Sequence, residues 1–321
     1  MACLVLLDGN NVAFSNFHTH AELKTSDGQA TGLIYGFLTS MIKLAKLYPG
    51  AVQIVVWDGP GKNWRHEFSK GRYKSNRNTT EGQVMREACY SQVQILYEIL
   101  KMLKIPQLQI PGLEADDGLG LLSHSWGELF SQVVIRSSDK DFYQLVSKRV
   151  SVLRGGVGPK AQKGGDLVTP QYLQDMYGIS AELWTTFRAL TGDGSDGLQG
   201  LGKGVGEVTA KKLVQAGVRL PVSKPPAKIL QQKKLAKITV HEQDWARVNE
   251  NYELSRIATQ IEGTRLSAGI LSQFLQFYQF YQAQGFKRTF DEVESWAITK
   301  ALAGLEMESL AGNTQTLLRL Y

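Results

Sequence analysis

The chain has 321 residues, of which 43% are hydrophobic and 21% are charged. This composition excludes an intrinsically disordered chain and is sufficient for one large domain or two small ones with a real core. The formal net charge is +6, which permits nucleic-acid binding without requiring it.

The cysteines and the N-terminal segment indicate a compartment. Cys3 and Cys89 are too few for a disulfide framework, and no CxxC pair suggests a zinc site. The N-terminal segment, MACLVLLDGN, has no basic residues before an apolar run that is too short to span a membrane. We therefore expect a cytoplasmic protein with no membrane partner, in a bacterium or in a phage-infected cell.

Short β-rich runs alternate with longer helical stretches in the first half of the chain. Helical spacing of apolar residues is clearest at residues 30–48 and 83–104. Strands are predicted at residues 3–7, 52–57, 107–110, 132–136 and 150–153. This alternation predicts an α/β fold in which helices cover both faces of a parallel sheet.

Three of the predicted strands are followed by an acidic residue. Asp8 follows the first strand, Asp58 the second, and Asp139 lies shortly after the strand at 132–136. A single acid at such a position commonly begins a turn. In a parallel sheet, however, the carboxyl ends of the strands share one edge, and ligand sites form there.

Further acids in short clusters bring the set to nine carboxylates. The nine are Asp8, Asp58, Glu114, Asp116, Asp117, Asp139, Asp141, Asp193 and Asp196. Like-charge repulsion makes such a concentration costly unless cations are bound. Carboxylate oxygens favour Mg²⁺ or Mn²⁺ over zinc. Two such ions are the usual device for phosphodiester hydrolysis.

Each acidic cluster also has a structural explanation. The acids of 114–117 could begin a helix, and Asp139 with Asp141 could cap a helix over 141–147. Asp193 and Asp196 could be turn residues in GDGSDG. Each explanation is reasonable alone, but all of them together account poorly for so many acids near predicted strand ends.

The second half of the chain reads as helical with a glycine-rich interruption. A helix is predicted over 166–190, and helical patterns resume at Glu207 and over 228–260. Between them Gly200, Gly202, Gly204 and Gly206 alternate. Such a turn can direct backbone N–H groups at a phosphate, or it can be a tight helix-to-helix turn that binds nothing.

Positive charge gathers in two segments. Residues 60–80 contain six Lys or Arg against one acid, with aromatic residues between them, and residues 203–237 contain nine against one. Such segments are often solvated faces, but beside a metal site they suit a polyanion. The residues expected to contact DNA are Arg65, Arg72, Tyr73, Gly200, Gly202, Lys203, Gly204, Gly206, Lys211 and Lys212.

A set of motifs carries a family resemblance. LLDGNNVAF, VVWDGPGKNWRHEFSKGRYKSNR, IPGLEADDGLG, VIRSSDKDFYQLV and LTGDGSDGLQGLGKGVGEVTA occur in that order within residues 4–215. They resemble the 5′ nucleases: flap endonucleases, phage 5′-3′ exonucleases and the 5′ nuclease domain of bacterial DNA polymerase I. The resemblance implies a PIN-like nuclease core over 1–184, with a helical arch at about 72–100. A helix–two-turn–helix duplex-binding region with C-terminal helices would occupy 185–321.

The resemblance also implies roles for single residues. Two Mg²⁺ ions are implied, with Mn²⁺ able to substitute. Lys74 would lie at the base of the arch near the scissile phosphate, with Arg77 beside it as a further catalytic contact. Arg188 would contact DNA at a position where some phage relatives carry lysine. The first ion would use Asp8, Asp58, Glu114 and Asp116, and the second Asp139, Asp141 and Asp193, with Asp117 between them and Asp196 acting through water.

The resulting functional expectation is a monomeric 5′ nuclease that hydrolyses DNA at 5′ flaps, free 5′ ends or branches, and RNA–DNA hybrids. A potassium ion is expected at the helix–two-turn–helix element of residues 200–210. Two alternatives are a PIN-type ribonuclease and a branched-DNA-binding protein without catalytic activity. The glycine turn argues against the first, and the retained carboxylates and Lys74 argue against the second.

Overall fold

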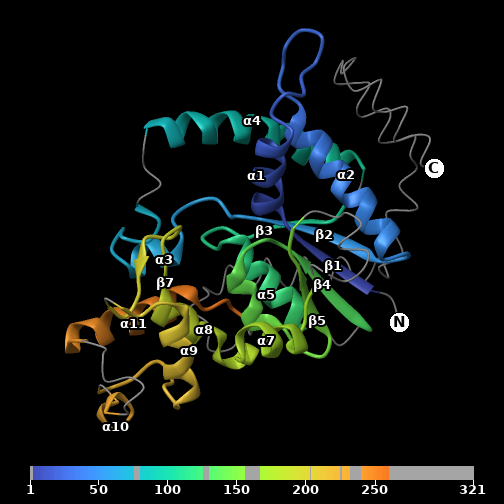
Figure 1. The fold of residues 1–321 in the computed structure, drawn as a ribbon. Helices are drawn as coiled ribbons and strands as arrows, with labels where there is room; N and C mark the ends of the chain where they lie inside the picture. The colour runs from blue at the N-terminus through green and yellow to red at the C-terminus, as the bar shows by residue number, and fades with distance from the viewer. Residues whose placement is uncertain are drawn as a thin grey trace.

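Helices enclose a central sheet on both faces in the computed structural model (Figure 1). The structure describes residues 3–75, 80–103, 105–125, 130–155, 167–202, 204–224, 226–231 and 240–259. Arg77 and Lys203 lie outside these ranges, so the predictions made for them are not addressed by the structure.

The sheet has six strands in the order β3-β2-β1-β4-β5-β6. Neighbouring strands are parallel except for the antiparallel pair β5 and β6. The strands are β1 (Cys3–Asp8), β2 (Val52–Trp57), β3 (Gln107–Gln109), β4 (Gln132–Arg136), β5 (Val150–Leu153) and β6 (Leu167–Val168). The five predicted strands are therefore confirmed, and their parallel arrangement places the carboxyl ends of β2, β1 and β4 side by side.

Alternating side chains of the strands supply two hydrophobic cores. Val5 and Leu7 of β1 join the core formed with α1 (Gly9–Thr19), α2 (Gly32–Leu47) and α4 (Thr80–Met102). Leu4 and Leu6 point to the opposite face, because successive side chains of a strand alternate. There they pack with α5 (Ala115–Ser125), α7 (Pro170–Tyr177), α8 (Ala181–Thr191), α9 (Glu207–Gln215) and α11 (Glu242–Ser255).

The helix predicted over 166–190 is wrong, because that segment contains a strand and two helices. The described part begins with β6, and Thr169 then caps α7, which has Pro170 in its first turn. Gly178 ends α7 with a left-handed φ of 61°, a conformation that favours glycine. Apolar residues keep their helical spacing on both sides of Gly178, so the sequence pattern did not show that the helix ends there.

The remaining elements are mostly short. The helix predicted at 141–147 is a 3₁₀ helix, Lys140–Leu145. The helix predicted at 228–260 is seen only as α10 (Ala227–Leu230) and α11, with residues 232–239 outside the described ranges. The other short elements are α3 (Trp64–Phe68), β7 (Gly192–Asp193) and β8 (Leu198–Gln199).

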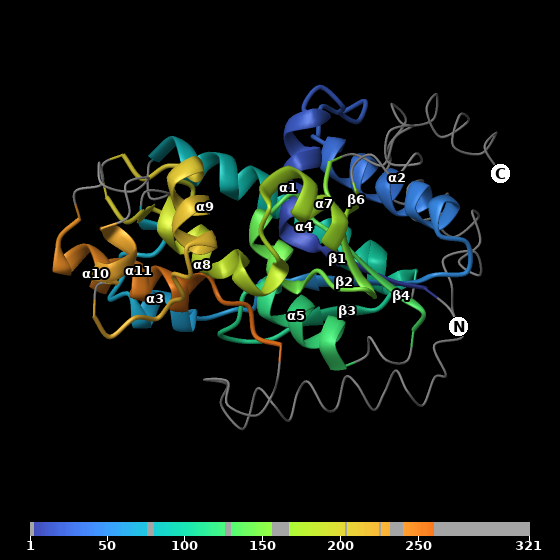
Figure 2. The same ribbon diagram turned by 60° about the horizontal axis from the view of Figure 1, so that its bottom comes forward.

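Helix α4 corresponds to most of the expected arch. Figures 1 and 2 show its first turns reaching beyond the sheet, toward the side of the molecule that carries α3 and α9. Val84 in this part is 64% exposed. Within the described ranges, none of the helices combines the length and the apolar character that a membrane span requires.

The division expected after residue 184 falls inside α8. Trp184 and Phe187, on either side of it, belong to the same hydrophobic core as β1 and α5. Figure 2 shows α8, α9 and α11 gathered at one side of the sheet. The helical region therefore packs directly on the α/β core, and a separate duplex-binding function for it stays a prediction.

Candidate metal centre

Strand ends position three carboxylates at one edge of the sheet. Asp8 ends β1, Asp58 follows β2, and Asp139 follows β4. Asp8 caps α1 by accepting a hydrogen bond from the backbone N–H of Asn11 (3.1 Å), and Asp139 caps the 3₁₀ helix through the N–H of Asp141 (2.8 Å). Asp8 and Asp139 therefore cap helices and also belong to the acidic cluster, so the two interpretations of these residues are both correct.

The start of α5 brings further carboxylates to this edge. Asp58 accepts a hydrogen bond from the backbone N–H of Ala115 (2.9 Å), which ties the end of β2 to the start of α5. Burial raises the pKa of Asp116 well above its usual value, and the charges of Asp139 and Asp8 raise it further. The carboxylates of Asp8, Asp116 and Asp139 therefore interact electrostatically, although they come from three separate segments of the chain.

The pKa of Asp8 reports the same crowding. Burial is the largest cause of its rise to about 7, and the charges of Asp58 and Asp139 add to it. Hydrogen bonds from the Ser137 hydroxyl and the Asn11 backbone act in the opposite direction. A divalent cation would relieve this repulsion and satisfy the oxygen-rich surroundings.

A second carboxylate group lies beside the first. Asp141, Asp193 and Asp196 each offer an oxygen, and these three atoms all lie within 4.8 Å of one another. Asp141 comes from the 3₁₀ helix, whereas Asp193 ends β7 and Asp196 lies in the turn between β7 and β8. Burial and the neighbouring Asp139 raise the pKa of Asp141 to about 7. The spacing of the oxygens is suitable for holding one metal ion.

Arg188 requires a correction. It was expected to contact DNA, but its side chain is 14% exposed and lies between two carboxylates of the second group. Its Nε donates to Asp141 Oδ1 (2.8 Å), and its Nη2 donates to Asp193. The guanidinium thus compensates the charge of the cluster, and the hydrogen bonds to Asp141 and Asp193 occupy its Nε and Nη2.

Lys74 connects the two carboxylate groups. Its Nζ donates to Glu114 Oε1 (2.5 Å), and its backbone N–H donates to the carbonyl oxygen of Asp196 (3.0 Å). Its φ of 56° lies in the left-handed region, which a non-glycine residue adopts at a cost. Burial disfavours its ammonium charge, but Glu114 and Asp196 outweigh that effect and raise the pKa above its usual value.

Tyr73 also differs from the expectation. It was assigned to DNA contact, but it is only 6% exposed, and its hydroxyl donates to Glu114 Oε2 (3.0 Å). The side chain therefore orients Glu114 from inside the protein. Arg72 next to it is 69% exposed and forms an ion pair with Glu250 (2.5 Å), so it remains accessible to a polyanion.

Arg65 and Asp117 form a buried pair, which corrects two predictions. Arg65, expected at DNA, is 2% exposed, and Asp117, expected between the metals, is 1% exposed. Two guanidinium nitrogens donate to the two carboxylate oxygens at 2.6 and 2.8 Å. Because Asp117 also accepts from the Trp64 indole and the Ala258 backbone, its oxygens are committed to packing rather than to a metal.

The glycine turn contains both packed and open positions. A Cβ on Gly200 would lie 2.6 Å from the carbonyl oxygens of Leu190 and Thr191, so glycine is required there by close packing. A Cβ at Gly204 or Gly206 would meet nothing within 4 Å, and both residues are exposed. Gly202 and Lys211 are half-buried and Lys212 is exposed. A backbone contact to phosphate is therefore most accessible at Gly204 and Gly206.

Several polar residues of the site were missed by the sequence analysis. The Ser137 hydroxyl donates to Asp8 Oδ2 (2.7 Å), and Asn10 Oδ1 accepts from the backbone N–H of Asp58 (2.9 Å). Asn11 Oδ1 accepts from the Ser138 backbone N–H (3.0 Å). All of them lie within three residues of the end of β1 or β4, so their position after a buried strand was the available signal.

More than half of the chain matches a known protein family. Residues 3–178 match the model for the N-terminal resolvase-like domain of 5′-3′ exonucleases. A 5′-3′ exonuclease of Buchnera aphidicola is 31% identical over 212 residues, which cover 66% of this chain and 69% of that protein. The thermostable DNA polymerase I of Thermus aquaticus is 39% identical over 212 residues. Those residues cover 66% of this chain but only 24% of the polymerase.

Solved structures show the same fold. The phage T5 5′-exonuclease with bound zinc has a TM-score of 0.58 at 18% identity, covering 99% of this chain and 98% of that one. A phage T5 flap endonuclease in complex with DNA and metal ions has a TM-score of 0.56 at 19% identity, over the same fractions of the two chains. At these identities the likeness shows only that the chains share an arrangement of helices and strands.

Proposed function

Because the chain belongs to the 5′-3′ exonuclease family, we propose that it is a divalent-metal-dependent nuclease that cuts DNA at 5′ flaps, free 5′ ends or branches. The observation that carries this proposal is the convergence of two carboxylate groups around Lys74. The side chain of Lys74 reaches Glu114, and its backbone reaches Asp196. A scissile phosphate at this place would face both metal positions and one ammonium group.

Eight of the nine carboxylates are assigned to metals under this proposal. Hard oxygen donors without histidine or cysteine favour Mg²⁺, with Mn²⁺ as a substitute. Bound ions would activate the attacking water and stabilise charge on the leaving oxygen. Asp8, Asp58, Glu114 and Asp116 would hold the first ion, and Asp139, Asp141, Asp193 and Asp196 the second.

The protein's own groups prepare this site. Tyr73 and Lys74 orient Glu114 through hydrogen bonds, and Arg188 orients Asp141. When a phosphate is present, the Lys74 ammonium can donate to a non-bridging oxygen, where negative charge grows in the transition state. Arg77 is proposed as a second phosphate contact at the start of the arch.

Duplex binding is proposed for the open part of the glycine turn and for exposed basic residues. Gly204 and Gly206 offer backbone N–H groups, while Lys212 and Arg72 offer charge at the surface. Lys203 is proposed to act with them. A potassium ion at the turn, cleavage of RNA–DNA hybrids, a monomeric state and a cytoplasmic location stay predictions.

A labelled flap substrate tests the proposal directly. We expect release of the labelled 5′ flap in Mg²⁺ and none in EDTA. Asp139→Asn should abolish cleavage but keep flap binding, because asparagine retains the oxygen that caps the 3₁₀ helix. Asp175→Asn, at an exposed position of α7, is the matched control and should cleave normally.

The same assay separates the alternatives. Preferential cleavage of single-stranded RNA would indicate a PIN-type ribonuclease, and flap binding without cleavage in Mg²⁺ or Mn²⁺ would indicate an inactive branch-binding protein.

A further inference from the structure

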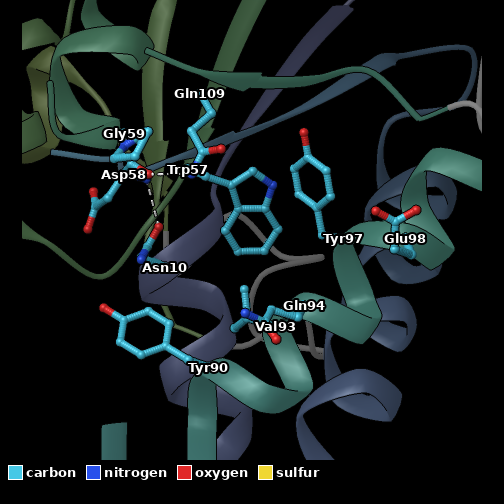
Figure 3. Close-up of a pocket in the computed structure, with 11 residues that line it drawn as sticks. Asn10, Trp57, Asp58, Gly59, Tyr90, Val93, Gln94, Tyr97, Glu98 and Gln109 are labelled. Atoms are coloured by element: carbon cyan, nitrogen blue, oxygen red, sulfur yellow. Dashed lines mark hydrogen bonds between the residues drawn. The ribbon is translucent and has the colours of Figure 1, made fainter. Parts of the chain in front are cut away.

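A cavity of about 610 Å³ adjoins the carboxylate cluster on the side of α4 (Figure 3). It lies between α4 and the carboxyl ends of β2 and β3, and Asp58 forms part of its wall. Its size is within the range of small-molecule sites. Of the eight carboxylates assigned to metals, only Asp58 lines it, so the rest of its wall has no role in the proposed metal chemistry.

One face of α4 supplies the aromatic part of the wall. Tyr90, Val93, Gln94 and Tyr97 line the cavity, and their spacing places them on a single helical face. Tyr90 is 46% exposed, which is unusual for so large an aromatic side chain and leaves its ring accessible. Figure 3 shows the rings of Tyr90 and Tyr97 at separate sides of the cavity.

The wall opposite α4 is formed by Trp57, whose ring is packed and hydrogen-bonded. Trp57 stacks on Phe37 with ring centroids 5.7 Å apart, and its Nε1 donates to Gln107 Oε1 (2.9 Å). A Cβ on Gly9 would lie only 2.4 Å from the indole. Because the ring is held on these sides, this wall exists before any ligand enters.

Amide groups provide directional contacts. Asn10 Oδ1 accepts from the Asp58 backbone N–H (2.9 Å), and Gln109 Nε2 donates to the Asp58 carbonyl oxygen (2.8 Å). These bonds fix both side chains and leave an Asn10 donor and a Gln109 acceptor for a ligand. Neutral donors and acceptors between aromatic rings match the edge and faces of a nucleobase.

The charge of the cavity selects against anions. Its lining includes Asp58 and Glu98 but no lysine or arginine. A phosphate group would be repelled here, whereas a neutral planar group would not. Since Asp58 also belongs to the carboxylate cluster, a nucleotide could place its phosphate at the cluster and its base in the cavity.

We propose that this cavity binds one unpaired nucleobase of the strand being cut. The proposal rests on the nuclease function proposed above and adds a contact to the base beside the scissile phosphate. Stacking on tyrosine tolerates all four bases, so the pocket favours an unpaired nucleotide over a paired one without selecting a sequence.

The test combines abasic substrates with a pocket variant. A series of flap substrates carries one abasic nucleotide at successive positions around the cleavage point, and the rate is measured in Mg²⁺ with enzyme below saturation. One position should lower the wild-type rate by about 5-fold to 100-fold, the equivalent of one stacked base. Tyr90→Ala should lower the rate on the intact flap. On the substrate that is abasic at that position, the same substitution should lower the rate little further, because the base that Tyr90 contacts is already absent.

Met102→Ala is the control, because Met102 is 62% exposed on the same helix and does not line the cavity. Thermal unfolding of both variants checks that the fold is retained. Equal rates on all abasic substrates, or a Tyr90→Ala loss that is the same with and without the base, would overturn the pocket assignment. Failure of the wild type to cut the intact flap would instead contradict the nuclease function.

Discussion

The buried pair of Arg65 and Asp117 predicts a large loss of stability on Arg65→Met. The substitution removes two hydrogen bonds to the Asp117 carboxylate and those to the carbonyl oxygens of Leu254 and Arg256 (both 2.8 Å). Burial disfavours the guanidinium charge, but Asp117 and Glu114 outweigh it and raise the pKa of Arg65 above its usual value. Without Arg65, the Asp117 charge is left buried at 1% exposure.

Breaking such a pair costs about 3–5 kcal/mol in the free energy of unfolding. For a chain of 321 residues, that loss lowers the melting temperature by about 4–7 °C. Arg72→Met is the matched control. The Arg72 pair with Glu250 lies at the surface, where an ion pair contributes about 0–1 kcal/mol.

Asp117→Asn distinguishes a packing role from a metal-binding role. If Asp117 serves packing, the melting temperature falls in metal-free buffer, and added Mg²⁺ still stabilises the variant. Arg65→Met with Asp117→Asn should then be more stable than Arg65→Met alone, because no buried charge is left. An unchanged metal-free melting temperature for Asp117→Asn, together with loss of stabilisation by Mg²⁺, would refute this reasoning.

Three further predictions follow from the site. Asp8 and Asp141 have pKa values raised to about 7, so their contribution to the stability of the metal-free protein is present at low pH and is lost as pH rises through 7. Mg²⁺ should consequently raise the melting temperature more above pH 7 than below it, and an equal rise at both would contradict the crowding of these carboxylates. Lys74→Ala should lower the single-turnover rate at saturating enzyme by roughly 10²-fold with a modest change in flap binding; a preserved bound rate would mean that Lys74 only attracts DNA. Replacing Lys203, Lys211 and Lys212 with alanine should reduce the slope of log affinity against log salt by about 0.9 for each lysine that contacts a phosphate, and an unchanged slope would place all three away from DNA.

The sequence by itself determined the sheet and the acids at its edge. Each strand is a short local run, and the residue that follows a buried parallel strand must emerge at its carboxyl end. Asp8, Asp58 and Asp139 could therefore be located from local pattern alone. The break at Gly178 was missed because the helical spacing of apolar residues continues through it.

Only the tertiary structure decided which charged side chains enter the site. Asp116 and Asp117 are neighbours, but about 100° of rotation per helical residue turns them in different directions. The neighbouring carboxylates raise the pKa of Asp116. Asp117 instead accepts hydrogen bonds from Arg65, which also donates to the carbonyl oxygen of Leu254. These partners are far apart along the chain, so local spacing carries no information about whether a basic residue such as Arg65 faces DNA or neutralises a buried acid.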